Sequence, residues 1–352
     1  MTVTDLISQR LKNQALTGSS FKKATEVVEY MCAIQAQEYA MAKWAIGLRS
    51  PGSREQDVDK AFNEGKILRT HVLRPTWHFI SPKDIRWMLE LTAPRIHIAN
   101  NFMCRKLGLD KKLLKKSAGI FVKALEGGKH LSRSALQELL QKNKIGSQGH
   151  HLSYITMYAE LEGLICSCPR EGKQFTYALL DERAGKQKKL DHDEALAELS
   201  RRYFISRGPA TIKDYCTWSG LSVKDAKEGI ASLEKNILKE SFQDAEYYSM
   251  SSSKNTKALR SFLMPDYDEY GMGYKDRSAI FNAAKYKAAV SRGNPVFNRM
   301  IILNGRIEGT WQRTFQKKEI AVETFPFSKL NSSKQKLLKE AVKDFQRFTT
   351  DS

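Results

Sequence analysis

Two glutamines separated by one alanine, Gln35 and Gln37, are the residues whose type and spacing first suggest chemistry in this chain. An amide has no useful pKa, so neither side chain can act as a general base. Its carbonyl can accept a hydrogen bond from a water molecule while its NH2 group donates elsewhere. The pair therefore suits a reaction that needs a well-placed water rather than a strong base. The alternative is that both side chains only cap or cross-link helices.

The elements that must position these glutamines can be read from the apolar pattern. The segment from Tyr30 to Arg49 has apolar residues at three- and four-residue spacing, which predicts a buried helix. Positions two apart on a regular helix point about 200° away from each other, so both amides face one pocket only if the helix starts, ends or kinks there. The segment from Arg69 to Ile80 predicts a strand or hairpin, with Pro75 restricting its backbone.

The charge of the chain favours a polyanionic partner. Its 352 residues include 58 Lys and Arg against 39 Asp and Glu, a net charge of +19. Such an excess is typical of proteins that bind nucleic acid, although a merely lysine-rich soluble protein has it too. The length is enough for two to four compact units.

Several classes of protein are not expected. No run of about 18 apolar residues would span a membrane, and the first residues do not resemble a secretory signal. The five cysteines are scattered and odd in number, which fits reduced thiols and a cytoplasmic location. Cys166 and Cys168 lack a second pair at zinc-finger spacing, and the chain has no phosphate-binding loop or other standard catalytic motif. We therefore expect no metal and no cofactor.

The chain repeats one plan three times, in which helices lead into a short β segment. The expected helices and β segments are 57–64 before 67–80, 132–141 and 152–162 before 164–180, and 211–219 and 223–234 before 237–250. Ser132, Thr211 and Ser222 stand where helix N-caps would, and Gly220 suits a helix end. Two short helices and a hairpin make a winged helix, so we predict tandem winged-helix units.

Two further segments carry charge or β signals. Asn100 to Lys123 predicts one amphipathic basic helix, which is either a phosphate-contacting face or an ordinary solvated surface. Near the C-terminus, Asn304-Gly305 predicts a tight hairpin between strands 299–303 and 307–315. A basic helix is expected from Lys329 to Phe348. The predicted class is α+β, mainly α, with units at 1–98, 99–182, 183–252 and a β-rich C-terminal element at 253–352.

Three segments together resemble the AlkZ-like winged-helix DNA glycosylases: Gln35-Ala36-Gln37, Trp44 to Arg49, and His71 to His78. That family carries a glutamine, an apolar residue and a second glutamine at its active site. A sister group, the YcaQ-like enzymes, has aspartate as the third member, so Gln37 places this chain on the AlkZ side. The resemblance continues near the C-terminus at Asp268, Glu269, Tyr270, Gly273, Tyr274 and Arg277. It implies three tandem winged helices held in a C shape by a β-barrel-like element.

The resemblance also implies a function. A purine alkylated at N7 or N3 is already cationic, so its glycosidic bond breaks readily and needs mainly a positioned water. Gln35 and Gln37 would position that water in a monofunctional glycosylase, and bulky N7-guanine adducts and interstrand crosslinks would be further substrates. The expected partner is duplex DNA, bound by a monomer. Residues expected to contact DNA near the lesion are Arg49, Arg69, His71, Arg74, Thr76 and His78, with Trp44, Asp268 and Glu269 as supporting residues.

Other interpretations stay open for several of these residues. Trp77 can be core, and Arg74 can pair with an acid. His71 and His78 have opposite strand parity, so a regular strand sends only one of them inward. Asp268 and Glu269 either pair with basic residues or lend negative potential to a cationic sugar. For the whole chain, the alternatives are a winged-helix transcription regulator, because such units usually only bind DNA, and a scaffold protein that binds RNA.

Overall fold

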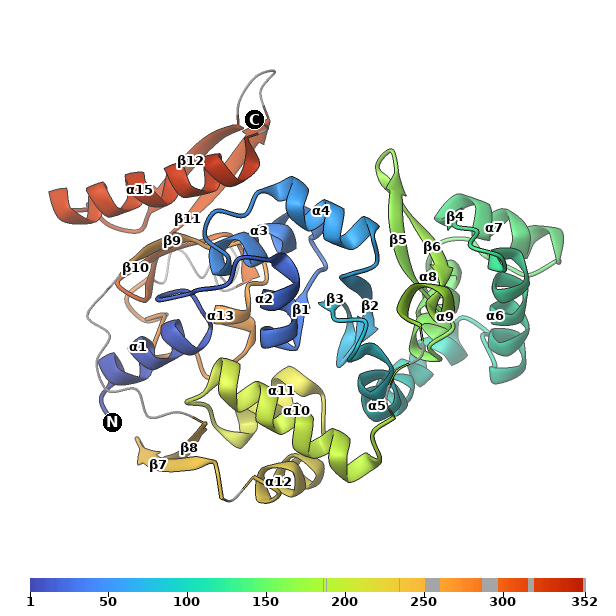
Figure 1. The fold of residues 1–352 in the computed structure, drawn as a ribbon, viewed down its shortest axis with the longest axis horizontal. Helices are drawn as coiled ribbons and strands as arrows, with labels where there is room; N and C mark the ends of the chain where they lie inside the picture. Colours follow the sequence, from blue (N-terminus) through green and yellow to red (C-terminus); the bar gives the residue numbers. More distant parts are fainter. Residues whose placement is uncertain are drawn as a thin grey trace.

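The computed structural model describes residues 1–350 except 186, 188, 234, 251–259, 287–296 and 316–319. Within these residues the fold is α+β, as predicted, with the strands gathered into three antiparallel sheets (Figure 1). The first part of the chain places strands β1, β2 and β3 at the centre of the molecule. Its elements are α1 (Val3–Asn13), α2 (Ala24–Met31), β1 (Ala33–Gln35), α3 (Tyr39–Arg49), α4 (Glu55–Asn63), β2 (Leu68–Val72) and β3 (Arg74–Ile80).

The second part forms the lobe on the right of Figure 1. Its hairpin confirms the one predicted at 164–180, and Ser132 caps α7 as expected. A long helix, α5, connects this lobe to the centre of the molecule. The elements are α5 (Ile85–Lys106), α6 (Lys111–Leu125), β4 (Leu131–Ser132), α7 (Arg133–Lys142), α8 (His150–Leu161), β5 (Ile165–Glu171), β6 (Gln174–Leu179) and α9 (Leu180–Ala184).

The third and fourth parts complete the body on the left of Figure 1. The C-terminal sheet is curled into a half-barrel in the strand order β12-β11-β10-β9, and its Asn304-Gly305 turn is confirmed. The elements are α10 (His192–Arg207), α11 (Ile212–Ser219), α12 (Val223–Ala231), β7 (Leu238–Phe242), β8 (Ala245–Ser249), β9 (Ser261–Leu263), α13 (Glu269–Met272), β10 (Met300–Leu303), β11 (Arg306–Phe315), β12 (Ile320–Pro326) and α15 (Ser332–Thr349).

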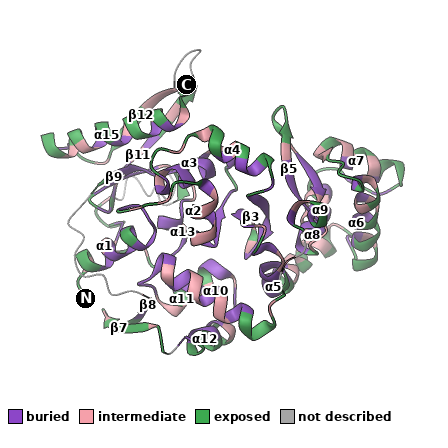
Figure 2. Cartoon of the chain, in the orientation of Figure 1, coloured by how far each residue is buried: buried purple, intermediate pink, exposed green. Residues whose placement is uncertain are grey.

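The first two hairpins belong to one sheet. The strand order β1-β3-β2-β5-β6-β4 joins residues of the first and second parts, and the link between them is the pairing of Arg69 with Ser167. Figure 2 shows that α3 is largely buried, whereas α6 and α7 have exposed outer surfaces. The position of the glutamines is therefore set by the most enclosed part of the fold.

The prediction of one helix from Tyr30 to Arg49 is wrong. Helix α2 ends at Met31, because the φ of +64° at Cys32 leaves the helical region, and Ala33 to Gln35 then pair with β3. The apolar spacing of the segment does fit a helix. However, the three-residue strand covers the free edge of β3 with main-chain hydrogen bonds, and that long-range pairing is invisible in a local pattern.

The single basic helix expected from Asn100 to Lys123 is also wrong. Helix α5 ends at Lys106 and α6 begins at Lys111. Gly108 has a φ of +66°, and the Asp110 side chain accepts a hydrogen bond from the Leu113 N–H, so the connection combines a left-handed turn with an N-cap. The sequence analysis also left out α10, which supplies the central arginine of the site described below.

Candidate active site

The register of the central sheet sorts its side chains into two faces. Gln35 lies opposite His78, and Thr70 lies opposite His78 on the other side of β3. Because opposite residues in an antiparallel pair share a face and residues two apart do too, Gln35, Arg74, Thr76 and His78 project from one side. We call this side the glutamine face. It packs toward α5, α10 and α11, whose apolar residues form one core cluster with Ala33, Leu68 and Ile80.

Gln35 is held firmly on the glutamine face. It is 6% exposed, and its backbone N–H donates to Glu269 Oε1 at 3.0 Å. Its side-chain carbonyl accepts a hydrogen bond from Arg74 Nη2 at 3.2 Å. The guanidinium therefore fixes which end of the amide is oxygen, and it leaves the NH2 group to point away from the arginine.

Gln37 has a different environment. It follows Ala36 in the bend before α3, and its side chain is exposed. The Ala36 N–H still donates to the Trp77 carbonyl at 2.7 Å, so the extended backbone continues one residue beyond β1. Because residues two apart on an extended chain point to the same side, both amides can reach the same side of the sheet, as they could not on a regular helix.

Arg74 connects Gln35 to a helix terminus. Its Nη1 donates to the Trp218 carbonyl at 2.7 Å and to the Thr217 carbonyl at 3.2 Å, at the C-terminal end of α11. Unpaired carbonyls and the negative end of the helix dipole favour a cation there. The side chain is half-buried rather than extended toward solvent, and its neighbours are carbonyls and an amide instead of the direct acidic partner considered from the sequence.

His78 lies next to Arg74 and is fully buried. Burial and the charge of Arg74 lower the pKa of its imidazole to about 3, so the ring is neutral. The Nδ1–H then donates to the Thr76 carbonyl at 2.9 Å, which leaves Nε2 as the acceptor facing Arg74 Nη2 at 3.4 Å. A buried neutral ring of this kind orients Arg74 and is not placed to touch DNA, contrary to the expectation for His78.

Glu269 anchors the strand that carries Gln35. Its Oε2 accepts hydrogen bonds from Arg207 Nη2 at 2.6 Å and Trp218 Nε1 at 2.9 Å, while Arg207 also binds the Ala33 carbonyl at 2.8 Å. Burial would raise the pKa of this carboxyl, but the charges of Arg207 and Arg74 and the hydrogen bonds it accepts hold the pKa at about 2. Glu269 is therefore an ionised, paired carboxylate.

The neighbouring acid, Asp268, binds Arg49 in a second buried pair. Both Arg49 Nη1 and Nη2 lie 2.9 Å from the Asp268 carboxylate, in a bidentate arrangement, and Arg49 is 0% exposed. Arg49 Nε also donates to the Gln14 carbonyl at 3.0 Å. A side chain enclosed in this way cannot reach a phosphate without leaving its carboxylate, so the expectation that Arg49 contacts DNA does not fit the structure.

The opposite side of the sheet, which we call the scaffold face, carries Arg69, His71 and Trp77. His71 Nδ1 contacts Glu160 Oε2, and Trp77 Nε1 donates to Glu160 Oε1 at 3.3 Å. His71 and His78 lie on opposite faces, as their parity predicts, but both are buried because helices cover both sides of the sheet. A direct DNA contact by His71 is therefore not supported.

Arg69 links the scaffold face to the glutamines. It is 4% exposed, stacks against the rings of Trp77 and Phe175, and donates from Nε to the Ala36 carbonyl at 3.0 Å. Burial lowers the pKa of its guanidinium to about 10. Arg69 thus fixes the peptide between Gln35 and Gln37 and is too enclosed to contact DNA.

Trp44, which was expected to support the site, lies away from the glutamines. Its ring packs against Phe345 and Phe348 of α15, and its Nε1 donates to the Leu263 carbonyl at 2.6 Å. Two residues that bind the sheet were not predicted from the sequence. Arg207 binds the strand that carries Gln35, and Glu160 binds His71 and Trp77 on the scaffold face. No local pattern marks them, because each acts on strands more than 80 residues away.

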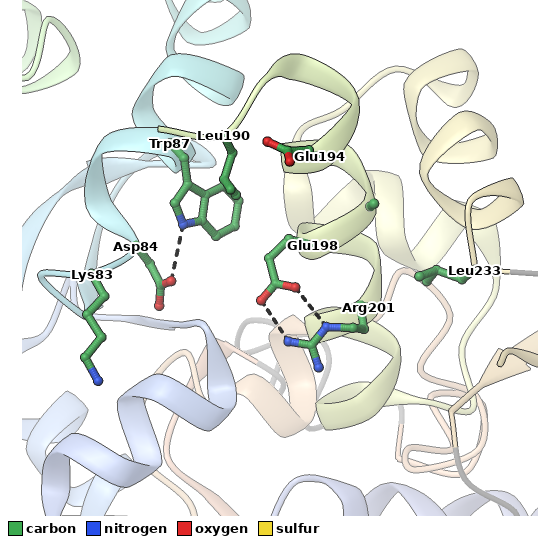
Figure 3. Close-up of a pocket in the computed structure, with 9 residues that line it drawn as sticks. Lys83, Asp84, Trp87, Leu190, Glu194, Glu198, Arg201 and Leu233 are labelled. Carbon is green, nitrogen blue, oxygen red and sulfur yellow. Dashed lines mark hydrogen bonds and ion pairs between the residues drawn. The ribbon is translucent and has the colours of Figure 1, made fainter. Parts of the chain in front are cut away.

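Two hollows are formed by elements that surround the central sheet. One of about 300 Å³ begins at Tyr39, two residues after Gln37, and is also lined by Lys43, Asp59, Asn63, Arg170 and Gly172. Another of about 430 Å³ lies between α5 and α10, where Trp87 binds Asp84 and Glu198 binds Arg201 (Figure 3). Neither hollow is lined by Gln35 or Gln37, so neither is part of the candidate site.

Within the described ranges, no three His, Cys, Asp or Glu side chains are grouped so that they could hold a metal ion. No helix in the same ranges has the length and apolar composition needed to cross a membrane.

Comparison with known proteins gives consistent matches over nearly the whole chain. The family described as DNA glycosylase AlkZ-like matches residues 28–348. The interstrand DNA cross-link repair glycosylase of Streptomyces sahachiroi is 22% identical over 336 residues, which cover 90% of this chain and 89% of that protein. The solved structure of Streptomyces sahachiroi DNA glycosylase AlkZ has a TM-score of 0.82 at 20% identity, covering 99% of this chain and 96% of that one. The structural match shows a shared fold.

Proposed function

Because this chain belongs to the DNA glycosylase AlkZ-like family, we propose that it hydrolyses the N-glycosidic bond of purines alkylated at N7 or N3. The observation that carries the proposal is the arrangement of Gln35, the last residue of β1, and Gln37, which follows two residues later in the bend before α3. One amide is fixed by Arg74 and the other is exposed to solvent. The tandem helix pairs and hairpins would act as winged-helix units that present this strand to DNA.

The two glutamines divide the work of positioning water. Gln35 keeps its carbonyl on Arg74, so its NH2 group can donate to the attacking water or to a sugar oxygen. The exposed Gln37 amide can accept a hydrogen bond from the same water through its carbonyl. The C–N bond breaks with its electron pair going to the alkylated base, which becomes neutral, and the water oxygen bonds to the sugar carbon and loses a proton to solvent. Neither glutamine therefore needs to take a proton. Such an enzyme needs no amine nucleophile and is monofunctional.

The electrostatics of the glutamine face suit this chemistry. His78 and Glu269 have pKa values of about 3 and about 2, so neither changes charge near neutral pH. Glu269 acts through the Gln35 backbone N–H and is a positioning residue. Thr76 is half-buried, and its hydroxyl oxygen is shielded with no hydrogen-bond partner among the described residues. We assign it to the substrate backbone, which it reaches by a side-chain rotation. Arg74 and Thr76 are then the DNA-contacting residues that remain from the original set.

Bulky adducts and crosslinks are included in the proposal for two reasons. Gln37 and Pro75 are exposed at the surface, so a large group on the base need not enter an enclosed cavity. In addition, the Streptomyces sahachiroi relative is named for interstrand crosslink repair. Duplex binding would use phosphate contacts from the basic surface, so affinity should fall steeply with salt concentration.

The test is release of 7-methylguanine from methylated duplex DNA by the native chain, Gln35→Ala and Gln37→Ala. Both variants should lose most of the activity while binding undamaged duplex with native affinity. A matched control is Gln141→Ala, since Gln141 is an exposed glutamine on α7 with no part in the site. If the folded native chain releases neither 7-methylguanine nor bulky N7 adducts or crosslinked bases, the chain is a DNA-binding protein without this activity.

A further inference from the structure

Helix α5 exposes two large apolar side chains side by side. Ile98 is 69% exposed and Phe102 is 66% exposed, the highest values for large apolar residues in the described part of the chain. They are four residues apart, so they lie on the same face of the helix in successive turns. A single exposed apolar residue is ordinary, but an adjacent pair of this size indicates a surface that is covered by a partner.

The surroundings of this pair identify the chemistry of the partner. The segment of α5 from residue 91 to 106 contains no Asp or Glu. Arg95, Arg105 and Lys106 are exposed on the same helical face, and four exposed lysines follow at the start of α6, namely Lys111, Lys112, Lys115 and Lys116. Carboxylates are few here: Asp110 caps α6, and Glu162 of the neighbouring helix end pairs with His97. A surface that combines large apolar groups with an excess of cations complements a polyanion that also has apolar parts. Duplex DNA has both, in its phosphates and in its sugars and bases.

A series of contacts also connects the helix that carries Ile98 and Phe102 to the glutamine face. Arg95 Nε donates to the Gly220 carbonyl at 2.6 Å. Gly220 lies so close to Leu73 that a Cβ at this glycine would be 2.3 Å from the Leu73 carbonyl oxygen. Leu73 precedes Arg74, which binds Gln35. An unbroken series of contacts therefore leads from Gln35 to the start of the exposed stripe.

The direction and length of the stripe fit a duplex that passes the site. Figure 1 shows α5 running from the central strands toward the lobe that contains α6, α7 and α8. At 1.5 Å per residue, Phe102 lies about 10 Å beyond Arg95 along the helix axis. That length is about three base-pair steps of 3.4 Å. DNA engaged at the glutamines would thus extend along Ile98 and Phe102.

We infer that Ile98 and Phe102 form an apolar DNA contact beside the catalytic strand, with Arg95 and Arg105 binding phosphates on either side. In proteins that bind the minor groove, apolar side chains of this kind press between base steps while arginines hold the backbone. The contact would keep the duplex in register with Gln35 and Gln37. This inference rests on the DNA binding in the proposed function and is independent of the bond that is hydrolysed.

The test measures the affinity of the full chain for an undamaged duplex at NaCl concentrations from about 50 to 200 mM. The double variant Ile98→Gln/Phe102→Gln should bind about tenfold more weakly at every salt concentration, with an unchanged slope of log K against log[NaCl], because apolar contacts release no counterions. Arg105→Gln should instead reduce the slope by about 0.9. Both changes replace exposed side chains, so the fold is retained, which circular dichroism and thermal unfolding would verify.

The matched control is Leu238→Gln on β7, where a 46% exposed leucine lies outside this stripe. It should bind as the native chain does. Native affinity in the double variant would overturn the inference, and so would a native dimer that the double substitution dissociates, since the pair would then be an interface between copies. Base release is measured separately: a native chain without it, whose double variant still loses affinity, would refute the proposed activity and retain the DNA contact.

Discussion

The two faces of the central sheet carry similar residues, but Arg74 of the glutamine face is half-buried whereas Arg69 of the scaffold face is almost completely buried. On the glutamine face Arg74 and Thr76 are half-buried and Gln35 and His78 are buried, while Gln37, just beyond the end of β1, is exposed. The scaffold face places Arg69 and His71 against α8 and the second hairpin, where both are almost completely buried. Strand parity therefore sets the role of an arginine or histidine in the segment from Arg69 to His78, because a shift of one residue moves a side chain to the other face.

The largest expected effect comes from the carboxylate behind the glutamine face. Glu269→Gln removes the charge that compensates Arg207, which is itself 0% exposed. Loss of one partner from a buried pair should lower the free energy of unfolding by about 3–5 kcal/mol. Urea unfolding followed by circular dichroism would measure the change. A loss no greater than that of an exposed substitution such as Gln141→Ala would mean that Glu269 does not anchor the strand.

On the scaffold face, Glu160→Gln should lower the stability of the fold without lowering the rate of base release. The substitution weakens the acceptor for His71 and Trp77, so the free energy of unfolding should fall by about 1–3 kcal/mol. The single-turnover rate of base release per folded molecule should remain native. A strongly reduced rate in the folded fraction would break the distinction between the two faces.

Arg69→Met tests the one side chain that joins the faces. The methionine keeps apolar packing against Trp77 and Phe175 but loses the hydrogen bond to the Ala36 carbonyl. The glutamine peptide would then be less well oriented, and the release rate at saturating DNA should fall about tenfold, with affinity for undamaged duplex unchanged. Weaker binding at a native rate would indicate that Arg69 contacts DNA after all.

The stability of the fold should depend on pH, whereas the rate of base release should not. His78 has a folded pKa of about 3 against 6.5, and Glu269 about 2 against 4.5, so the native state binds fewer protons than the unfolded state at acidic pH. Their stabilisation is present above about pH 6.5 and declines as the pH falls through 6.5 and then 4.5. The rate of release from folded protein should be flat from about pH 5 to 9. A bell-shaped profile in that range would require a general acid or base and contradict the water-positioning account.

Local signals were sufficient for much of the fold. Asn304-Gly305 predicts its hairpin because both residues accept the positive φ of a tight turn, 53° and 76° here. Ser132, Thr211 and Ser222 cap their helices as expected, since a cap depends only on residues three positions away. These elements could be predicted because their determinants are adjacent in the chain.

The candidate site depended on distant partners and was harder to predict. Arg49 pairs with Asp268 across 219 positions, and Arg207 with Glu269 across 62. Nothing next to Arg49 distinguishes a buried pair from a surface cation. The glutamines were identified by type and spacing, but their placement on a strand rather than a helix follows from pairing between β1 and β3.

The most direct test of the central claim is single-turnover release of 7-methylguanine at saturating DNA, comparing Gln37→Ala with Glu160→Gln. Loss of one positioned amide from the glutamine face should lower the rate by about 10²–10³-fold, in the range seen for loss of a single stabilising donor at an active site. The change on the scaffold face should leave the rate of the folded fraction native. Equal rates in the two variants would contradict the assignment of catalysis to the glutamine face.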